Sequence, residues 1–153
     1  WWDGKVGIWP IGHVEQAQKS SVKHPAGADV WVNDNVDKDM YHLMLINEVV
    51  PKIVEVWPSF DRPGVKVKLQ QDGAKSHIDP MDEEWQEFLH EMGWEDKIEL
   101  LTQPANSPDT NVNDLAFFNS LQTDYYDYAP TNSFELIEFV KKAHAEFPIS
   151  KLK

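Results

Sequence analysis

The chain has 153 residues, of which 41% are hydrophobic and 26% are charged, and it contains no cysteine. This length and composition are typical of one globular domain with a hydrophobic core, and they exclude a fibrous protein, disulfide bonds and zinc–thiolate sites. The formal net charge of −12 argues against strong autonomous binding to phosphate backbones, which normally requires a basic surface. No apolar run approaches the roughly 18 residues of a membrane-spanning helix, so we expect no membrane partner.

The first half of the chain contains extended and helical patterns. Residues 5–11 alternate in polarity and predict a strand that Pro10 stops, residues 15–29 predict a surface loop, and 30–32 predict a short extended piece. Over residues 40–57 an apolar side chain recurs every four positions, which predicts a helix with a broad buried face. We expect this helix to bend near Pro51, because proline lacks the amide that the helical hydrogen bonds need.

The second half continues the alternation. Valine or leucine alternates with lysine over 65–69, which predicts a strand that leads towards Asp72. Residues 82–92 predict an acidic amphipathic helix that ends near Gly93, and 98–101 predict another brief strand.

Two helices are expected after that strand. One begins after Asn111 or Asn113, and a C-terminal helix covers 134–147 with Asn132 or Ser133 as its cap. Strands that alternate with helices predict an α/β fold with some parallel pairing, in one domain that spans the chain.

Much of the negative charge lies in and around the acidic helix. We expect these acids to form a solvated face, which could serve as a partner surface. Against the single Lys97, residues 79–99 hold nine acids: Asp79, Asp82, Glu83, Glu84, Glu87, Glu91, Glu95, Asp96 and Glu99.

Two aspartates are the candidate site residues. Asp72 stands where the strand runs out into a glycine turn, and Asp114 stands in the first turn of an expected helix. A strand end and a helix start fix the direction of a side chain, so two distant carboxylates can converge there. Converging carboxylates without nearby bases suit hard divalent cations such as Mg²⁺ or Mn²⁺, and favour phosphoryl transfer. Two simpler interpretations remain open, since aspartate before glycine is common in tight turns and an acid in a helix's first turn is stabilised by the dipole.

Other motifs give weaker signals. The run 109–113 resembles the start of a calcium loop, but Asp114 stands where that loop needs glycine and Ser120 where it needs glutamate, so we reject it. His77 either lines the Asp72 site or is a solvated loop histidine. The seven tryptophans favour core packing over a stacking surface for bases.

Five segments together resemble the mariner-like branch of the DDE/D transposases. The pairing of QQDGAKSHI with SPDxNxxD is the most specific part of the resemblance. The segments are GKVGIWPI (4–11), INEVVPKIVEVWP (46–58), VKLQQDGAKSHID (67–79), LLTQPANSPDTNVNDLAFFNSLQ (100–122) and FELIEFVKKA (134–143).

The resemblance implies an RNase H-like α/β domain with a mixed sheet flanked by helices, in which three acids hold two Mg²⁺ or Mn²⁺ ions for DNA strand cleavage and transfer. It places the second acid at Asp72 and the third at Asp114, not at Asp109. It also implies DNA as partner (transposon ends and target), a homodimer in full-length members, and the nucleus as location.

The first acid of that family lies on the opening strand, before the GKVGIWP segment with which this sequence nearly begins. We therefore expect a fold that lacks its first strands, and a chain that is incomplete and inactive alone. Two alternatives stay open: a non-catalytic remnant that binds nucleic acid through Lys66, Lys68, Lys75, His77 and the C-terminal lysines, or a host-adopted interaction protein that uses the acidic face.

Overall fold

The computed structural model describes residues 3–104, 113 and 117–148. The chain divides into two compact units, which are treated separately below. The first unit comprises the described residues of Trp1–Gly7 and Val36–Leu115, and the second comprises those of Ile8–Asn35 and Ala116–Lys153.

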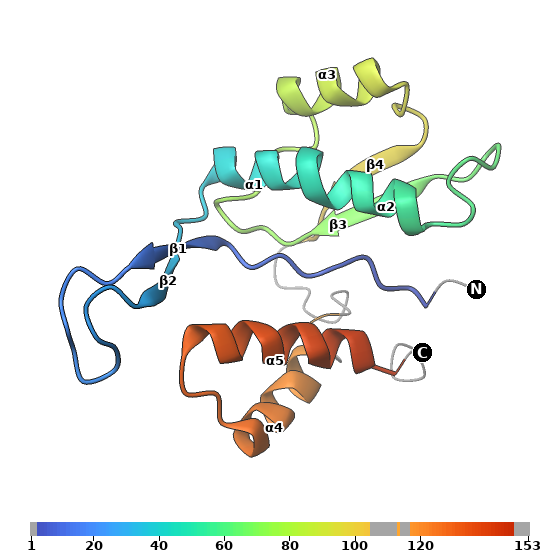
Figure 1. The fold of residues 1–153 in the computed structure, drawn as a ribbon. Helices are drawn as coiled ribbons and strands as arrows, with labels where there is room; N and C mark the ends of the chain where they lie inside the picture. Colours follow the sequence, from blue (N-terminus) through green and yellow to red (C-terminus); the bar gives the residue numbers. More distant parts are fainter. Residues whose placement is uncertain (1–2, 105–112, 114–116, 149–153) are drawn as a thin grey trace. The chain divides into compact units, whose positions relative to one another are not determined.

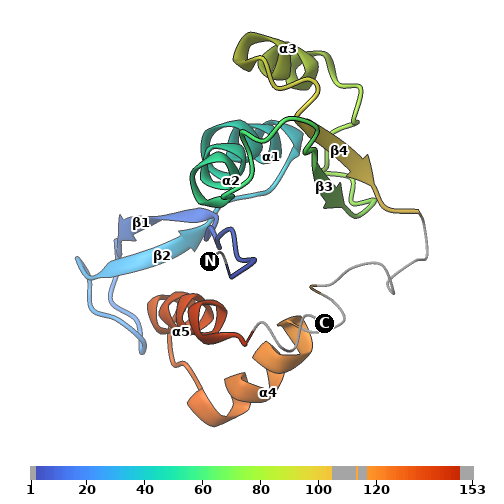
Figure 2. The ribbon, with the colours of Figure 1, turned by 90° about the vertical axis from the view of Figure 1, so that its right-hand side faces the viewer.

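The first unit contains a long helical run followed by a β–α–β element. The run consists of α1 (Lys38–Met44), a π-helical turn η1 (Leu45–Val49) and α2 (Val50–Val56) (Figure 1). Strand β3 (Val67–Gln71), helix α3 (Glu83–Met92) and strand β4 (Ile98–Thr102) follow. Strands β3 and β4 are parallel neighbours and run in the same direction in Figure 2.

The irregularity predicted near Pro51 takes the form of the π-helical turn. The amide of Val50 donates to the carbonyl of Leu45, five residues earlier, instead of to the carbonyl four residues earlier. Pro51 itself has no amide to contribute, and it stands at the start of α2, where a missing donor is tolerated. The helix predicted over 40–57 is thus confirmed, with a local change of hydrogen bonding.

The core of the first unit joins the helical run to β3, α3 and β4. It contains Val50 and Ile53 from α2, Val67 from β3, and Trp85 from α3, all at most 2% exposed. Trp57 and Trp94 pack against it, which agrees with core packing for these tryptophans. Asp82 caps α3 through the Trp85 amide, and Gly93 ends it in the left-handed conformation, as the sequence predicts.

The second unit holds an antiparallel hairpin and two helices. Strand β1 (Gly12–Gln16) pairs with β2 (Asp29–Asn33). Helices α4 (Phe118–Tyr128) and α5 (Ser133–Glu146) follow, and Asn132 caps α5 through the Glu135 amide.

The prediction of a strand over 5–11 is wrong. Those residues form no strand, and β1 begins only at Gly12, after Pro10. Proline has no amide for a strand ladder, whereas the residues after it can pair with β2 in the register Gly12↔Asn33. The predicted loop accordingly shrinks, because Glu15 and Gln16 belong to β1 and Asp29 belongs to β2.

The predicted α/β class is confirmed, and the described strands form two two-stranded sheets, one antiparallel and one parallel. In the part of the chain that the structure describes, no helix has the length and apolar character that would let it cross a membrane.

Candidate active site

The parallel strands β3 and β4 end side by side. In their register Gln71 stands opposite Thr102, and the amide of Gln103 donates to the carbonyl of Gln71 at 2.7 Å. Asp72 is the first residue after β3. The carboxyl ends of parallel strands are where ligands bind in open α/β sheets, so the candidate residue Asp72 stands at a favourable edge.

Gln71 anchors this edge from inside. Its side chain is buried, with 6% of the residue exposed. Nε2 donates to the carbonyl of Ile78 at 2.6 Å and to Oγ1 of Thr102 at 3.3 Å, and Oε1 accepts the hydroxyl of Tyr41 at 3.0 Å. A buried amide needs such partners, and these link the end of β3 to β4, to α1 and to the far end of the loop that contains Asp72.

Asp72 folds into a tight turn with an exposed carboxylate. Its Oδ1 accepts the amide of Ala74 at 2.8 Å, and the Asp72 side chain is 55% exposed. Nδ1 of His77 lies 2.9 Å from the carbonyl oxygen of Asp72 and 3.0 Å from Oδ1. Because a carbonyl oxygen can only accept, Nδ1 of His77 carries the hydrogen. Asp72 therefore makes the turn contact that the simpler interpretation predicts, its role as a metal ligand stays a prediction, and both described contacts of its carboxylate use Oδ1.

His77 and Tyr41 form the wall beside this turn. Their rings lie 4.3 Å apart, centre to centre, with their planes tilted by 33°. Burial, and secondly the charge of Asp72, raise the pKa of Tyr41 to about 12. The phenol is therefore neutral at physiological pH and acts as the hydrogen-bond donor to Gln71. His77 is only 20% exposed in its side chain, so it is not the solvated loop histidine of the alternative interpretation.

Asp114 lies outside the described residues, and its convergence with Asp72 stays a prediction. Within the described ranges, which leave Asp114 out, no group of three histidines or acids has the arrangement of a metal site. The segment that leads to Asp114 does leave the sheet at Gln103, beside the end of β3.

The three predicted nucleic-acid lysines are exposed, and acidic residues lie near each of them. Lys68 stands opposite Glu99 in the β3–β4 register. Lys66 lines a pocket of about 330 Å³ together with Glu95 and Glu99. This face of the β–α–β element therefore carries mixed charge.

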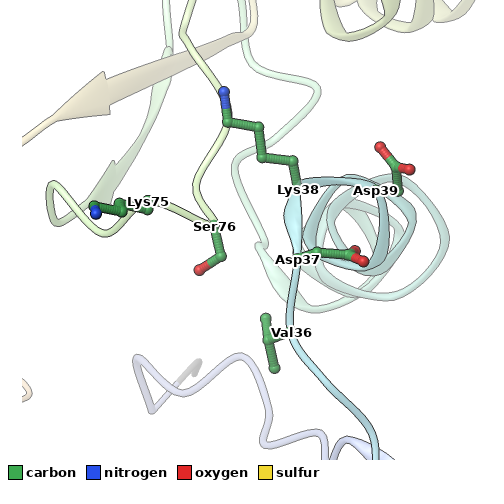
Figure 3. Close-up of a pocket in the computed structure, with 6 residues that line it drawn as sticks. All are labelled: Val36, Asp37, Lys38, Asp39, Lys75 and Ser76. Atoms are coloured by element: carbon green, nitrogen blue, oxygen red, sulfur yellow. The ribbon is translucent and has the colours of Figure 1, made fainter.

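The third lysine, Lys75, lines a pocket of about 470 Å³ at the start of α1 with Val36, Ser76 and Asp39 among its neighbours. Lys38 borders the same pocket, and Figure 3 shows both lysine side chains beside it. Asp37 also lines it and caps α1 by accepting the Met40 amide at 2.9 Å. The positive charge is again dispersed among acids, and the role of Lys75 in binding nucleic acid stays a prediction.

Sequence reasoning missed Gln71 and the site-facing role of Tyr41. Gln71 lies on the same face of β3 as Val67 and Leu69, which face inward. A polar residue on that inward face could have indicated a buried hydrogen-bond network. Tyr41 was identified only as part of the apolar helix face.

The acidic segment forms the predicted surface helix. Trp85 and Leu89 face the core, while Glu83, Glu87 and Glu91 are exposed. Glu84 contacts the buried His42 of α1, with 3.0 Å between its Oε2 and Nδ1 of the histidine.

Among the comparisons with known proteins, the one with solved structures shows the fold alone. No protein-family model matches the sequence, and no curated protein matches it. A solved structure described as "Crystal structure of the catalytic domain of Mos1 mariner transposase" matches 93% of this chain and 77% of its own, with a TM-score of 0.53 and 16% identity. This chain therefore has the fold of a mariner transposase catalytic domain.

Proposed function

We propose that this chain is a transposase-like catalytic core for divalent-metal-dependent cleavage and transfer of DNA strands, in which Asp72 and Asp114 hold Mg²⁺ or Mn²⁺. One observation carries the proposal: Asp72 follows β3 directly at the carboxyl edge of the parallel pair, beside the point where the chain leaves β4 towards Asp114. The similarity to a transposase catalytic domain supports the same choice.

The chemistry of the residues present fits a hard divalent cation. Such ions take oxygen ligands, above all carboxylates, and the Asp72 carboxylate is exposed, with its described hydrogen bonds confined to Oδ1. Two such ions, when bound, stabilise the attacking and leaving oxygens of an in-line displacement at phosphorus. The contribution of the chain is to hold Asp72 directly after the end of β3.

DNA is the proposed substrate, in the form of transposon ends and of target DNA. The proposed location is the nucleus, and the proposed oligomeric state is a homodimer. We expect weak DNA binding by this chain alone. The lysines at positions 66 and 68 stand among acids, and the net charge of −12 repels a phosphate backbone.

Titration with Mn²⁺ tests the metal site. We expect the wild-type chain to bind Mn²⁺ and Asp72→Asn to abolish measurable binding, read from the electron paramagnetic resonance of free Mn²⁺. Asp79→Asn is the matched control, because Asp79 is also exposed and also accepts an amide two residues on, from Met81 at 2.8 Å. Equal loss of binding in both variants would show a general charge effect and contradict a site at Asp72.

Titration with duplex DNA at several salt concentrations tests the partner. The proposal predicts weak, salt-dependent binding that Mn²⁺ strengthens, since the cation offsets the carboxylates. Binding that Mn²⁺ does not change would instead favour a non-catalytic nucleic-acid remnant. No binding at low salt, with or without Mn²⁺, would favour an interaction protein that uses the acidic α3.

A further inference from the structure

Two sets of contacts hold together the ends of the loop that carries Asp72, and we call them the inner closure and the outer closure. In the inner closure the buried Gln71 donates to the carbonyl of Ile78, so the residues before and after the loop are tied together. In the outer closure Nδ1 of His77 contacts both the carbonyl and Oδ1 of Asp72. Between these two closures the Asp72 side chain has little freedom, although it is exposed.

One residue of a different element contacts both closures. Tyr41, on α1, donates its hydroxyl to Oε1 of Gln71 at 3.0 Å, which fixes the amide so that Nε2 faces Ile78 and Thr102. The ring of Tyr41 lies against the ring of His77, with 4.3 Å between the centroids. Tyr41 therefore has a polar contact with the inner closure and a packing contact with the outer one.

We propose that Tyr41 is a positioning residue for Asp72, which orients the carboxylate through Gln71 and His77 without contacting a metal or the substrate itself. The inference rests on the proposed function, in which Asp72 is a metal ligand. Hydrogen-bonded neighbours of metal ligands fix ligand orientation, and their loss typically lowers metal affinity by about ten- to a hundredfold.

The electrostatics agree with this arrangement. The charge of Asp72 contributes, after burial, to the raised pKa of Tyr41, so the phenol and the carboxylate are close enough to interact. Because the phenol stays protonated, its hydroxyl remains a donor, and the orientation of the Gln71 amide does not change over the physiological pH range.

Two conservative variants separate the two contacts. Tyr41→Phe keeps the ring against His77 and removes the hydroxyl, whereas His77→Phe keeps a ring against Tyr41 and removes the hydrogen bond to Asp72. Tyr126→Phe is the control for loss of a phenol hydroxyl, since Tyr126 is 73% exposed on α4. All variants are made in the full chain.

The first readout needs no metal. Amide hydrogen exchange and the nitrogen chemical shifts of the His77 ring, measured by NMR, report the turn directly. We expect Tyr41→Phe to speed exchange at Ala74 and to shift the His77 ring signals, while the amides of α3 exchange as in wild type. The positioning role is overturned if Ala74 exchanges as in the Tyr126→Phe control, or if the amides of α3 exchange faster by the same factor, because the effect would then be a general loss of stability.

The second readout is Mn²⁺ affinity. We expect Tyr41→Phe and His77→Phe each to weaken it by about tenfold, the lower end of the range for such neighbours, and Tyr126→Phe to leave it unchanged. Unchanged affinity in Tyr41→Phe overturns the inference. If the wild-type chain binds no Mn²⁺, the proposed function fails, and the exchange of Ala74 still decides whether Tyr41 positions the turn.

Discussion

The charge of Asp72, which follows β3, acts on the phenol of Tyr41, which is on α1 of the same unit. Burial and, secondly, the charge of Asp72 together raise the pKa of Tyr41 from 10.0 to about 12. Removing the charge must lower the pKa, while the contribution of burial remains.

We therefore predict that Asp72→Asn lowers the pKa of Tyr41 towards, but not to, 10.0. The absorbance of the phenolate, taken as the difference from the Tyr41→Phe variant, measures it. Because the folded pKa is the higher one, the stabilisation that Tyr41 contributes is complete below pH 10.0 and is lost as the pH rises towards about 12. A Tyr41 pKa in Asp72→Asn equal to that in wild type would contradict this electrostatic interaction.

His13 joins the β1–β2 hairpin to the residue that follows it. Its Nε2 lies 2.9 Å from Glu15 and its Nδ1 lies 2.8 Å from Asp34. These two bonds, first the one to Glu15 and then the one to Asp34, raise the pKa of His13 above 6.5. We predict that Glu15→Gln and Asp34→Asn each lower the pKa of His13, which NMR titration measures.

The sign of the stability effect follows from that direction. A raised folded pKa means that the contribution of His13 is complete below its unfolded value of 6.5 and is lost as the pH rises through the folded value. The thermal unfolding midpoint of the wild-type protein should therefore fall as the pH rises across that window. In His13→Gln the midpoint should depend less on pH. Equal pH profiles for the two would refute the assignment.

Gly12 allows the close approach of β1 and β2. A Cβ atom placed on it would lie 2.4 Å from the carbonyl oxygen of Val32 and 2.6 Å from the ring of Trp31. Backbone cannot move aside as a flexible side chain can, so Gly12→Ala should destabilise the second unit by about 1–3 kcal/mol. Chemical denaturation measures this change. Gly27→Ala, which meets nothing within 4 Å but shares a positive φ, separates the steric effect from backbone strain, and an equal loss there would argue against the clash.

The cap of α3 gives a test of the acidic helix. Oδ1 of Asp82 accepts the Trp85 amide at 3.2 Å, and loss of such a cap costs about 1 kcal/mol. We predict that Asp82→Ala lowers the free energy of unfolding by that amount, whereas Glu87→Ala, an exposed change in the same helix, has a much smaller effect. An Asp82→Ala loss no larger than that of Glu87→Ala would contradict the capping role of Asp82.

The elements with a strong pattern could be predicted from sequence, since their own residues specify them. The alternation before Asp72, the caps Asp82 and Asn132, and Gly93 all have local signals that the structure confirms. The segment 5–11 alternates too, but a strand also needs a partner, and only the residues after Pro10 find one.

The site was predictable in part. Asp72 stands at a strand end, as its position in the sequence indicates. The buried Gln71 network could not be read from the sequence, because its partners Tyr41, Ile78 and Thr102 come from separate segments that only the fold brings together. His77 was predicted either to line the Asp72 site or to bind nucleic acid, and in the structure it contacts Asp72.

Whether Asp72 and Asp114 bind the same ion is the central question, and a double-mutant cycle of Mn²⁺ affinity tests it most directly. The measurement compares Asp72→Asn, Asp114→Asn and their combination, with Asp109→Asn as control. A shared site predicts that each single variant loses most of the affinity, that the combination loses little more, and that Asp109→Asn binds as wild type does. Losses of Mn²⁺ binding free energy that simply add in the double variant would contradict a shared site. An Asp114→Asn variant that binds Mn²⁺ as Asp109→Asn does would also contradict it.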